Sequence, residues 1–293
     1  MGDALSALSA AVADRYRIER ELGAALAVLL ALVAAAPAAA QRAPDRTRSA
    51  RIADLTWIEA ERYLDTSTVV VIPLGAEAKE HGPQLRLRND ELLARYYADR
   101  LFPATPVAMY PTITYHFYPA FVDYPGSTTL RLETARDMVI DIVRSIARHG
   151  PRRFYILNTG VSTVRALAPA QDSLAAGGII MRFTNGGPRS DSAEARLRQQ
   201  PGGTHADEFE TSMMLYMFPQ YVDMSKAAKD YHPGQSPLMR DSAAAARDDR
   251  TWSRTGLFGD ATLATREKGR VVVEAHVLDI LDEIAALRRA PIR

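Results

Sequence analysis

The 293-residue sequence contains no cysteine, which excludes disulfide bonds, cysteine-ligated zinc and a cysteine nucleophile. It also lacks an excess of charge of one sign, because 36 Lys and Arg residues face 35 Asp and Glu residues and leave a formal net charge of +1. This balance provides no bulk attraction for nucleic acid or acidic membranes, and no nucleic-acid partner is predicted. Hydrophobic residues make up 47% of the chain, the composition of an ordinary globular protein.

Long apolar runs are scarce as well. The one candidate, residues 23–36, is shorter than the roughly 20 residues that a membrane-spanning helix needs. Arginines precede it and an Ala-Ala-Ala sequence follows it before Gln41, which is the order of a signal peptide with its cleavage site. We therefore expect residues 1–40 to be a signal peptide or an N-terminal membrane anchor, and the protein to be exported to the periplasm or secreted. A buried helix of the domain is the alternative, and residues 41–53 are predicted to be a linker.

A polar loop follows the most strand-like stretch of the sequence. Residues 69–72 are consecutive Val and Ile, the pattern of a strand buried on both faces, and Pro73 and Gly75 end it. Ligands of open α/β sheets bind beyond the carboxyl ends of the strands. His81 and Asp90 lie there, and an imidazole with a carboxylate suits a hard or borderline divalent metal ion. A solvated surface loop, whose charges only keep the protein soluble, is the alternative.

Strand and helix patterns alternate along the chain, which predicts a single α/β domain over residues 54–290. Strands are predicted at residues 68–74, 107–113, 153–157 and 178–183. Helices are predicted at residues 56–64, 91–101, 133–149, 166–176, 191–200 and 263–287.

Two later segments contain candidate substrate-binding residues. An aromatic loop at residues 115–127 contains Tyr124, and it either walls a small-molecule pocket or contacts another subunit. Asn158, Thr159 and Ser162 follow the third predicted strand. They either hold a substrate at the start of the next helix or form a plain strand-to-helix turn.

Motif blocks along the domain resemble those of the creatininase (creatinine amidohydrolase) family, in the same order. The first block keeps the family's spacing between His81 and Asp90, and a later block contains His205 and Glu210 in a pattern similar to H-A-G-x-x-E-T-S. The blocks are residues 73–90, 124–127, 204–212 and 256–260. The chain departs from the family where Lys79 replaces a metal-binding Glu, where Gln84 replaces a His, and where Gly160 replaces a metal-binding His.

The resemblance implies a three-layer α/β/α sandwich and a homo-oligomer, often a hexamer. It also implies a metal-dependent hydrolase of a small, non-peptide amide or formamide, with Zn, Mn or Fe as the divalent cofactor. The family's site holds two metals, of which this chain keeps one position. The implied ligands of that position are His81, Asp90 and Glu210, and Glu80 is available in place of the lost Glu.

Two functions compete on this basis. The first is a hydrolase with one metal ion per site, in which His205 passes a proton to the leaving amine and Lys79 stabilises the oxyanion. The second is a non-catalytic creatininase-fold protein that serves in binding or assembly. The changes at Lys79 and Gly160 favour the second function. The joint retention of the other histidine and acidic motif residues favours the first.

Overall fold

The computed structural model describes residues 48–231 and 253–292. The predicted signal peptide at residues 1–40 lies outside the described residues, as do most of the linker and residues 232–252. The described residues belong to one compact unit, as predicted for a single α/β domain. Among them, no helix has both the length and the apolar character needed to span a bilayer.

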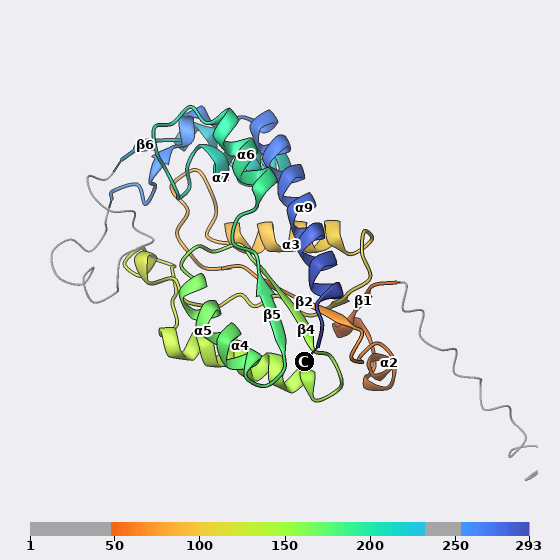
Figure 1. Ribbon diagram of the computed structural model, residues 1–293. Helices are drawn as coiled ribbons and strands as arrows, with labels where there is room; N and C mark the ends of the chain where they lie inside the picture. Colours follow the sequence, from red (N-terminus) through yellow and green to blue (C-terminus); the bar gives the residue numbers. More distant parts are fainter. Residues whose placement is uncertain (1–47, 232–252, 293) are drawn as a thin grey trace, which may run out of the picture. The chain divides into compact units, whose positions relative to one another are not determined.

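A five-stranded parallel sheet forms the middle layer of this domain, with the strand order β1-β3-β2-β4-β5 (Figure 1). The chain passes from β2 to β3 on one side and then returns to place β4 on the other side of β2. The carboxyl ends of β2 and β4 therefore form a topological switch point, where α/β proteins bind ligands. The strands are β1 (Ala50–Arg51), β2 (Val69–Leu74), β3 (Ala108–Met109), β4 (Arg153–Asn158) and β5 (Ile180–Phe183).

Helices cover both faces of the sheet, which makes the three-layer sandwich that the sequence predicted (Figure 1). Because side chains alternate along a strand, Val70 and Ile72 pack against α4 and α5, whereas Val69 and Val71 pack on the side of α3, α7 and α9. The helices are α2 (Trp57–Glu61), α3 (Asn89–Leu101), α4 (Leu132–Ala147), α5 (Val164–Ala175), α6 (Pro188–Leu197), α7 (Glu208–Met217) and α9 (Arg266–Arg289).

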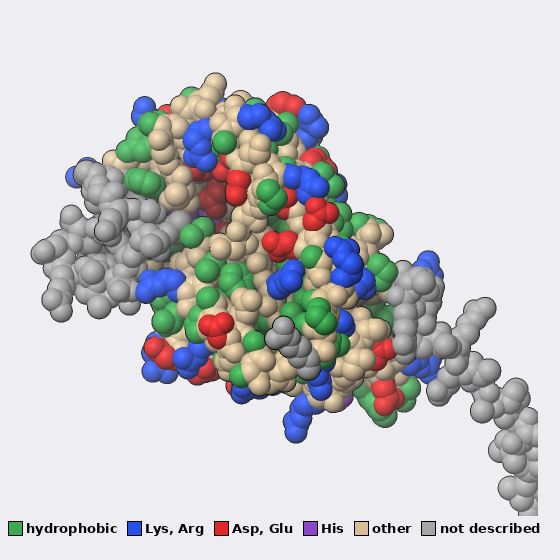
Figure 2. All heavy atoms as spheres, in the orientation of Figure 1, with side chains coloured by type: hydrophobic (Ala, Val, Ile, Leu, Met, Phe, Trp, Pro, Cys, Tyr) green, Lys and Arg blue, Asp and Glu red, His purple; other side chains and the backbone are tan. Residues whose placement is uncertain are grey.

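Short elements complete the described fold. A small antiparallel pair joins β6 (Lys229–Asp230) to β7 (Gly259–Asp260). The 3-10 helices are Ile52–Asp54, Pro119–Phe121, Pro219–Tyr221, Met224–Lys226 and Ala261–Leu263. On the face shown in Figure 2, acidic and basic side chains are interspersed, in keeping with the balanced charge of the sequence.

One expectation about residues 107–127 is wrong. The strand predicted at residues 107–113 is only Ala108–Met109, because Pro111 has no N–H to continue the sheet hydrogen bonds. The aromatic loop at residues 115–127 is partly buried: Tyr118 and Phe121 are almost completely buried, whereas Tyr115 and Val122 are exposed. This loop therefore packs against the interior of the protein.

His116, in the same loop, should make the fold sensitive to acid. Burial lowers the pKa of His116 from 6.5 to about 4. Between these two pH values, His116 is mostly protonated in the unfolded chain and mostly neutral in the folded protein. Neutral His116 therefore contributes about 3 kcal/mol to the free energy of unfolding. This contribution is fully present above pH 6.5 and is lost as the pH falls towards 4. We expect His116→Leu to flatten this pH dependence in urea unfolding measured between pH 7 and pH 4.5.

The matched control is His149→Leu, because His149 is an exposed histidine just beyond the end of α4. This variant should keep the pH dependence of the wild type. Equal pH dependence in His116→Leu and the wild type would contradict the assignment.

Candidate functional site

The loop after β2 is held tightly against the start of α3. A Cβ atom at Gly75 would lie 2.2 Å from the backbone oxygen of Asp90, so this close approach requires glycine. The same backbone oxygen accepts a hydrogen bond of 3.0 Å from the hydroxyl of Thr159, in the turn after β4. Both sides of the switch point thus fix the position of Asp90.

Asp90 contacts both Lys79 and His81, and the three side chains form a buried group. Its Oδ2 lies 2.7 Å from the ammonium of Lys79, and its Oδ1 lies 2.8 Å from Nε2 of His81. All three side chains are buried. Burial alone would raise the pKa of Asp90, but the charges of Lys79 and His81 outweigh it and hold this pKa well below its usual range. Asp90 is therefore a carboxylate at neutral pH.

A second imidazole–carboxylate pair lies beside the first. Nε2 of His205 is 3.0 Å from Oε2 of Glu80, and both side chains are buried. Burial opposes the charge of Glu80, yet His205 more than offsets this effect, and the pKa of Glu80 falls below its ordinary value. The rings of His205 and His81 are 5.1 Å apart, which brings the two pairs into one cluster.

The turn before α7 brings His205 close to Glu210, which lies in the first turn of this helix. Asp207 caps this helix by accepting hydrogen bonds from the N–H groups of Phe209 and Glu210. Ala206 has a positive φ of 49°, an uncommon conformation for a residue with a Cβ atom, and its N–H donates to the carboxylate of Glu210. The bend at Ala206 turns His205 back towards Glu210, with Nδ1 of His205 3.7 Å from Oε2 of Glu210.

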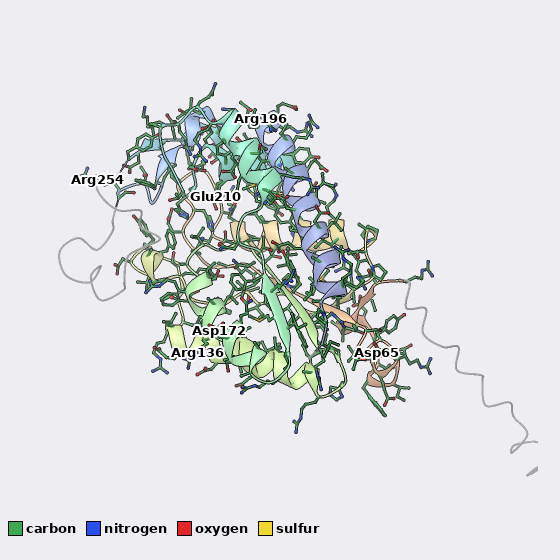
Figure 3. All side chains as sticks on the ribbon, viewed as in Figure 1. Asp65, Arg136, Asp172, Arg196, Glu210 and Arg254 are labelled. Atoms are coloured by element: carbon green, nitrogen blue, oxygen red, sulfur yellow. The ribbon has the colours of Figure 1, made fainter. Side chains whose placement is uncertain are left out.

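Three of these side chains have the chemistry and spacing of a metal site. Potential ligand atoms of His81, His205 and Glu210 lie within 4.8 Å of one another, and Glu210, on α7, is labelled in Figure 3. Each histidine also has its Nε2 against a buried carboxylate, the arrangement that orients ligating histidines in metal sites. Nδ1 of His81 lies 2.9 Å from the carbonyl of Lys79, so coordination through this atom requires that contact to open. The residues present fit one divalent ion.

Aromatic side chains occupy the space beside Lys79. Its ammonium lies 4.9 Å from the ring centre of Phe121 and 5.5 Å from that of Tyr118. A Cβ atom at Gly160 would lie 3.2 Å from the Tyr118 ring and 3.0 Å from Thr163. A side chain at position 160 would therefore require Tyr118 and Thr163 to shift.

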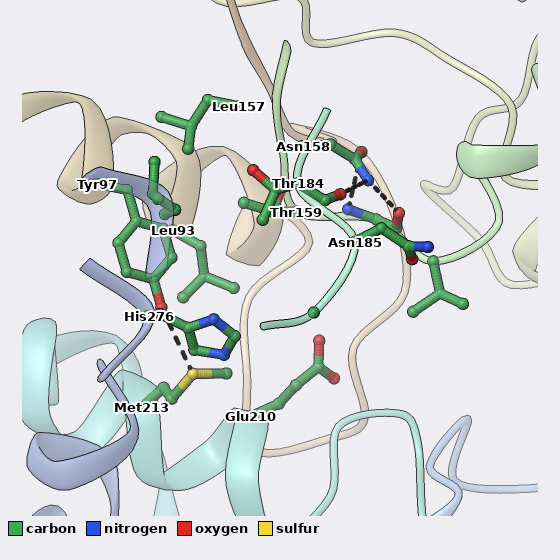
Figure 4. Close-up of a pocket in the computed structure, with 14 residues that line it drawn as sticks. Leu93, Tyr97, Leu157, Asn158, Thr159, Thr184, Asn185, Glu210, Met213 and His276 are labelled. Carbon is green, nitrogen blue, oxygen red and sulfur yellow. Dashed lines mark hydrogen bonds between the residues drawn. The ribbon is translucent and has the colours of Figure 1, made fainter. Parts of the chain in front are cut away.

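A cavity of about 170 Å³ adjoins the cluster at Glu210 (Figure 4). It lies at the carboxyl ends of β4 and β5, and α3, α7 and α9 form its opposite wall. Its lining residues are Leu93, Tyr97, Leu157, Asn158, Thr159, Gly160, Val161, Thr184, Asn185, Gly186, Glu210, Met213, His276 and Ile280.

The geometry favours other roles for several predicted residues. Asp90 and Glu80, expected to be metal ligands, lie against Nε2 of His81 and His205 instead. The ammonium of Lys79 binds Asp90 and does not line the cavity, so it is not placed to contact an oxyanion there. His205, expected to be a proton carrier, lies among the potential ligands.

The predicted substrate-binding residues divide into two pairs. Asn158 and Thr159 line the cavity. Ser162 and Tyr124 do not: the hydroxyl of Ser162 donates to the carbonyl of Phe117, and that of Tyr124 donates to the carbonyl of Ser253. Their hydroxyls are engaged in joining loops of the protein.

His276 is a cavity residue that sequence reasoning missed. It lies on α9 between Val273 and Ile280, two core-facing positions of this helix. A histidine within the apolar stripe of an amphipathic helix was the available signal, because such a side chain points to the interior.

Comparison with known proteins identifies relatives over nearly the whole domain. The model of the creatininase family, described as creatinine amidohydrolase, matches residues 53–284. Creatinine amidohydrolase of Pseudomonas putida is 27% identical over 257 residues, which cover 81% of this chain and 97% of that protein. The mycofactocin precursor peptide peptidase of Mycobacterium tuberculosis is 29% identical over 251 residues, covering 80% and 91% of the two chains. A solved structure of creatininase with Mn superposes with a TM-score of 0.65 at 25% identity, covering 83% of this chain and all of that one.

The buried pair of Lys79 and Asp90 should contribute strongly to stability. Lys79→Met would leave Asp90 as a buried charge without its cation, and we expect the free energy of unfolding to fall by about 3–5 kcal/mol in urea titrations. Lys79→Met combined with Asp90→Leu removes both charges and should recover much of this loss.

The control variant is Lys226→Met, which breaks a surface pair with Asp223 and should change stability by less than about 1 kcal/mol. A Lys79→Met protein as stable as Lys226→Met would show that Asp90 does not depend on the ammonium.

Proposed function

The chain belongs to the creatininase family, and from this premise we propose that it is a hydrolase of a carbon–nitrogen bond in a small, non-peptide amide or formamide. We further propose that it works with one divalent ion per chain, Zn, Mn or Fe. The observation that carries this proposal is the group of His81, His205 and Glu210 beside a cavity. A ligand set of two imidazoles and one carboxylate leaves positions open for water and substrate.

Some residues of the site would bind the metal ion, and others orient the residues that bind it. When bound, a divalent ion supplies a Lewis acid that polarises an amide carbonyl and makes water more acidic. His81, His205 and Glu210 would hold it. Asp90 and Glu80 fix the rings of the two histidines through Nε2, and Lys79 keeps Asp90 in place.

Proton transfer is assigned to Glu80. This carboxylate is ionised at neutral pH, since its pKa is lowered by His205 despite burial, and it lies 3.0 Å from Nε2 of His205. Unlike Asp90, which is paired with the ammonium of Lys79, Glu80 forms no ion pair with a lysine in the described part of the chain. In this role it accepts a proton from the attacking water and returns it to the leaving amine.

Two features support one ion in place of the family's two. The ammonium of Lys79 lies 2.7 Å from the carboxylate of Asp90, so this carboxylate is already paired with a cation and is not available to bind a second metal ion. Repulsion between an ammonium and a divalent ion at such a distance costs on the order of several kcal/mol in a partly wet site. Tyr118 and Thr163 lie close to the position of a Cβ atom at residue 160, so a metal-binding side chain there would require both to shift.

Elemental analysis of the purified protein should find one divalent ion per chain. His81→Ala should lose the ion and any amide hydrolysis, because it removes one of three ligands. Glu210→Gln should weaken binding by at least about tenfold, since an amide is a poorer ligand than a carboxylate. His149→Ala, which changes an exposed histidine remote from this cluster in sequence, should retain the metal content of the wild type.

Two ions per wild-type chain would contradict the proposal of a single ion. No ion after growth with Zn, Mn or Fe, together with unchanged stability in a chelator, would instead support the non-catalytic alternative. The observation that favours this alternative is the contact of both His81 ring nitrogens with acceptor atoms, which a doubly protonated imidazole would satisfy without a metal.

We also propose that the protein is a homo-oligomer. Apolar side chains are exposed on segments next to the site, among them Tyr115, Val122 and Val161. Burial of such side chains between subunits would remove apolar surface from water.

Light scattering at micromolar concentration should give a multiple of the protomer mass. The double variant Tyr115→Ser with Val122→Ser should shift the mass towards the monomer, whereas Leu278→Ser, an exposed apolar position on α9, should not. A monomeric wild type would overturn the proposal.

A further inference from the structure

The cavity next to Glu210 has the size of a small ring. Its volume of about 170 Å³ is close to the roughly 150 Å³ of an apolar cavity that accepts benzene. Because Glu210 belongs both to the cavity wall and to the ligand group, a molecule in the cavity has its near end at the proposed reaction centre.

The two walls of the cavity differ in character (Figure 4). Leu93, Tyr97 and Met213 provide an apolar wall, and the opposite wall contains Asn158 and Thr159. The polar atoms of these two residues are already engaged: the Asn158 side chain bonds the Gly160 and Thr184 carbonyls, the Gly160 N–H and the Thr163 hydroxyl, and the Thr159 hydroxyl bonds backbone carbonyls. They therefore shape the cavity without offering strong hydrogen bonds to a ligand.

His276 is different, because its imidazole makes no hydrogen bond to the part of the chain that the structure describes. It lies on the apolar wall with its ring centre 6.0 Å from that of Tyr97. Burial lowers the pKa of His276, an effect only partly opposed by Asp279 and Asp191, so the ring is neutral at pH 7. A neutral imidazole offers one donor and one acceptor nitrogen.

We propose that this cavity binds a ring of benzene size on the substrate, and that His276 selects rings bearing a hydrogen-bonding substituent such as a hydroxyl. The inference rests on the proposed function and refines it: the amide substrate carries an aromatic or similarly sized cyclic group next to the bond that is cleaved. A mainly apolar pocket with a small number of placed polar groups is the usual design of a selective small-molecule site. His276 would be a specificity residue, remote from the bond-breaking step.

Phenol and toluene are suitable probes, since they have similar size and differ in the hydroxyl group. The full chain, labelled at its methionine methyl groups, is titrated with each probe in the presence of a chelator, and the Met213 resonance is followed by NMR. In the wild type we expect both probes to shift this resonance, and phenol to bind about fivefold more tightly than toluene, as one added neutral hydrogen bond provides. His276→Leu should bind toluene as well as before and lose the preference for phenol.

His276→Gln, which keeps a polar group, should retain part of the preference, and this variant decides the matter if His276→Leu does not fold. Leu278→Ala, on the exposed side of the same helix, is the matched control and should behave as the wild type. Absence of any Met213 shift, or the same preference for phenol in His276→Leu and His276→Gln as in the wild type, would overturn the inference. Because the titration involves no metal and no bond cleavage, its result is independent of whether the protein hydrolyses amides.

Discussion

The ion pair between Lys79 and Asp90 is the interaction on which the rest of the site depends. Both groups are buried, so each would be costly without the other. The pair connects the loop after β2 to the first turn of α3, and Asp90 in turn orients His81. The lysine at position 79 thus supplies both a positive charge and part of the internal support of the site.

Much of the fold was predictable from the sequence because it depends on local patterns. The run of Val and Ile at residues 69–72 predicted β2, and the 3–4 spacing of apolar residues predicted α4 and α9 to within about three residues at most of their ends. The helix predicted at residues 56–64 is present as α2, and a capping box of Thr56 and Glu59 begins it. The strand at residues 107–113 was overestimated because the prediction followed the apolar pattern past Pro111, which cannot donate to the sheet hydrogen bonds.

The site was predictable as a location and only partly as a set of roles. The family resemblance placed His81, Asp90 and Glu210 in one region, but which carboxylate faces which imidazole depends on side-chain directions. Those directions follow from tertiary contacts, such as the close approach of Gly75 to Asp90. His276 comes from a helix nearly 200 residues away from the first motif, so no local pattern could join it to the cavity.

Glu210 has two possible partners, the backbone N–H of Ala206 and a metal ion. Its carboxylate now accepts the N–H of Ala206, which helps to hold a conformation that costs on the order of 1 kcal/mol for a residue with a side chain. If the carboxylate turned towards a cation, this support would weaken, and the peptide between His205 and Asp207 would be free to relax. The backbone geometry at Ala206 is therefore coupled to occupancy of the metal site. Binding of a metal ion would change the conformation of the segment that contains His205.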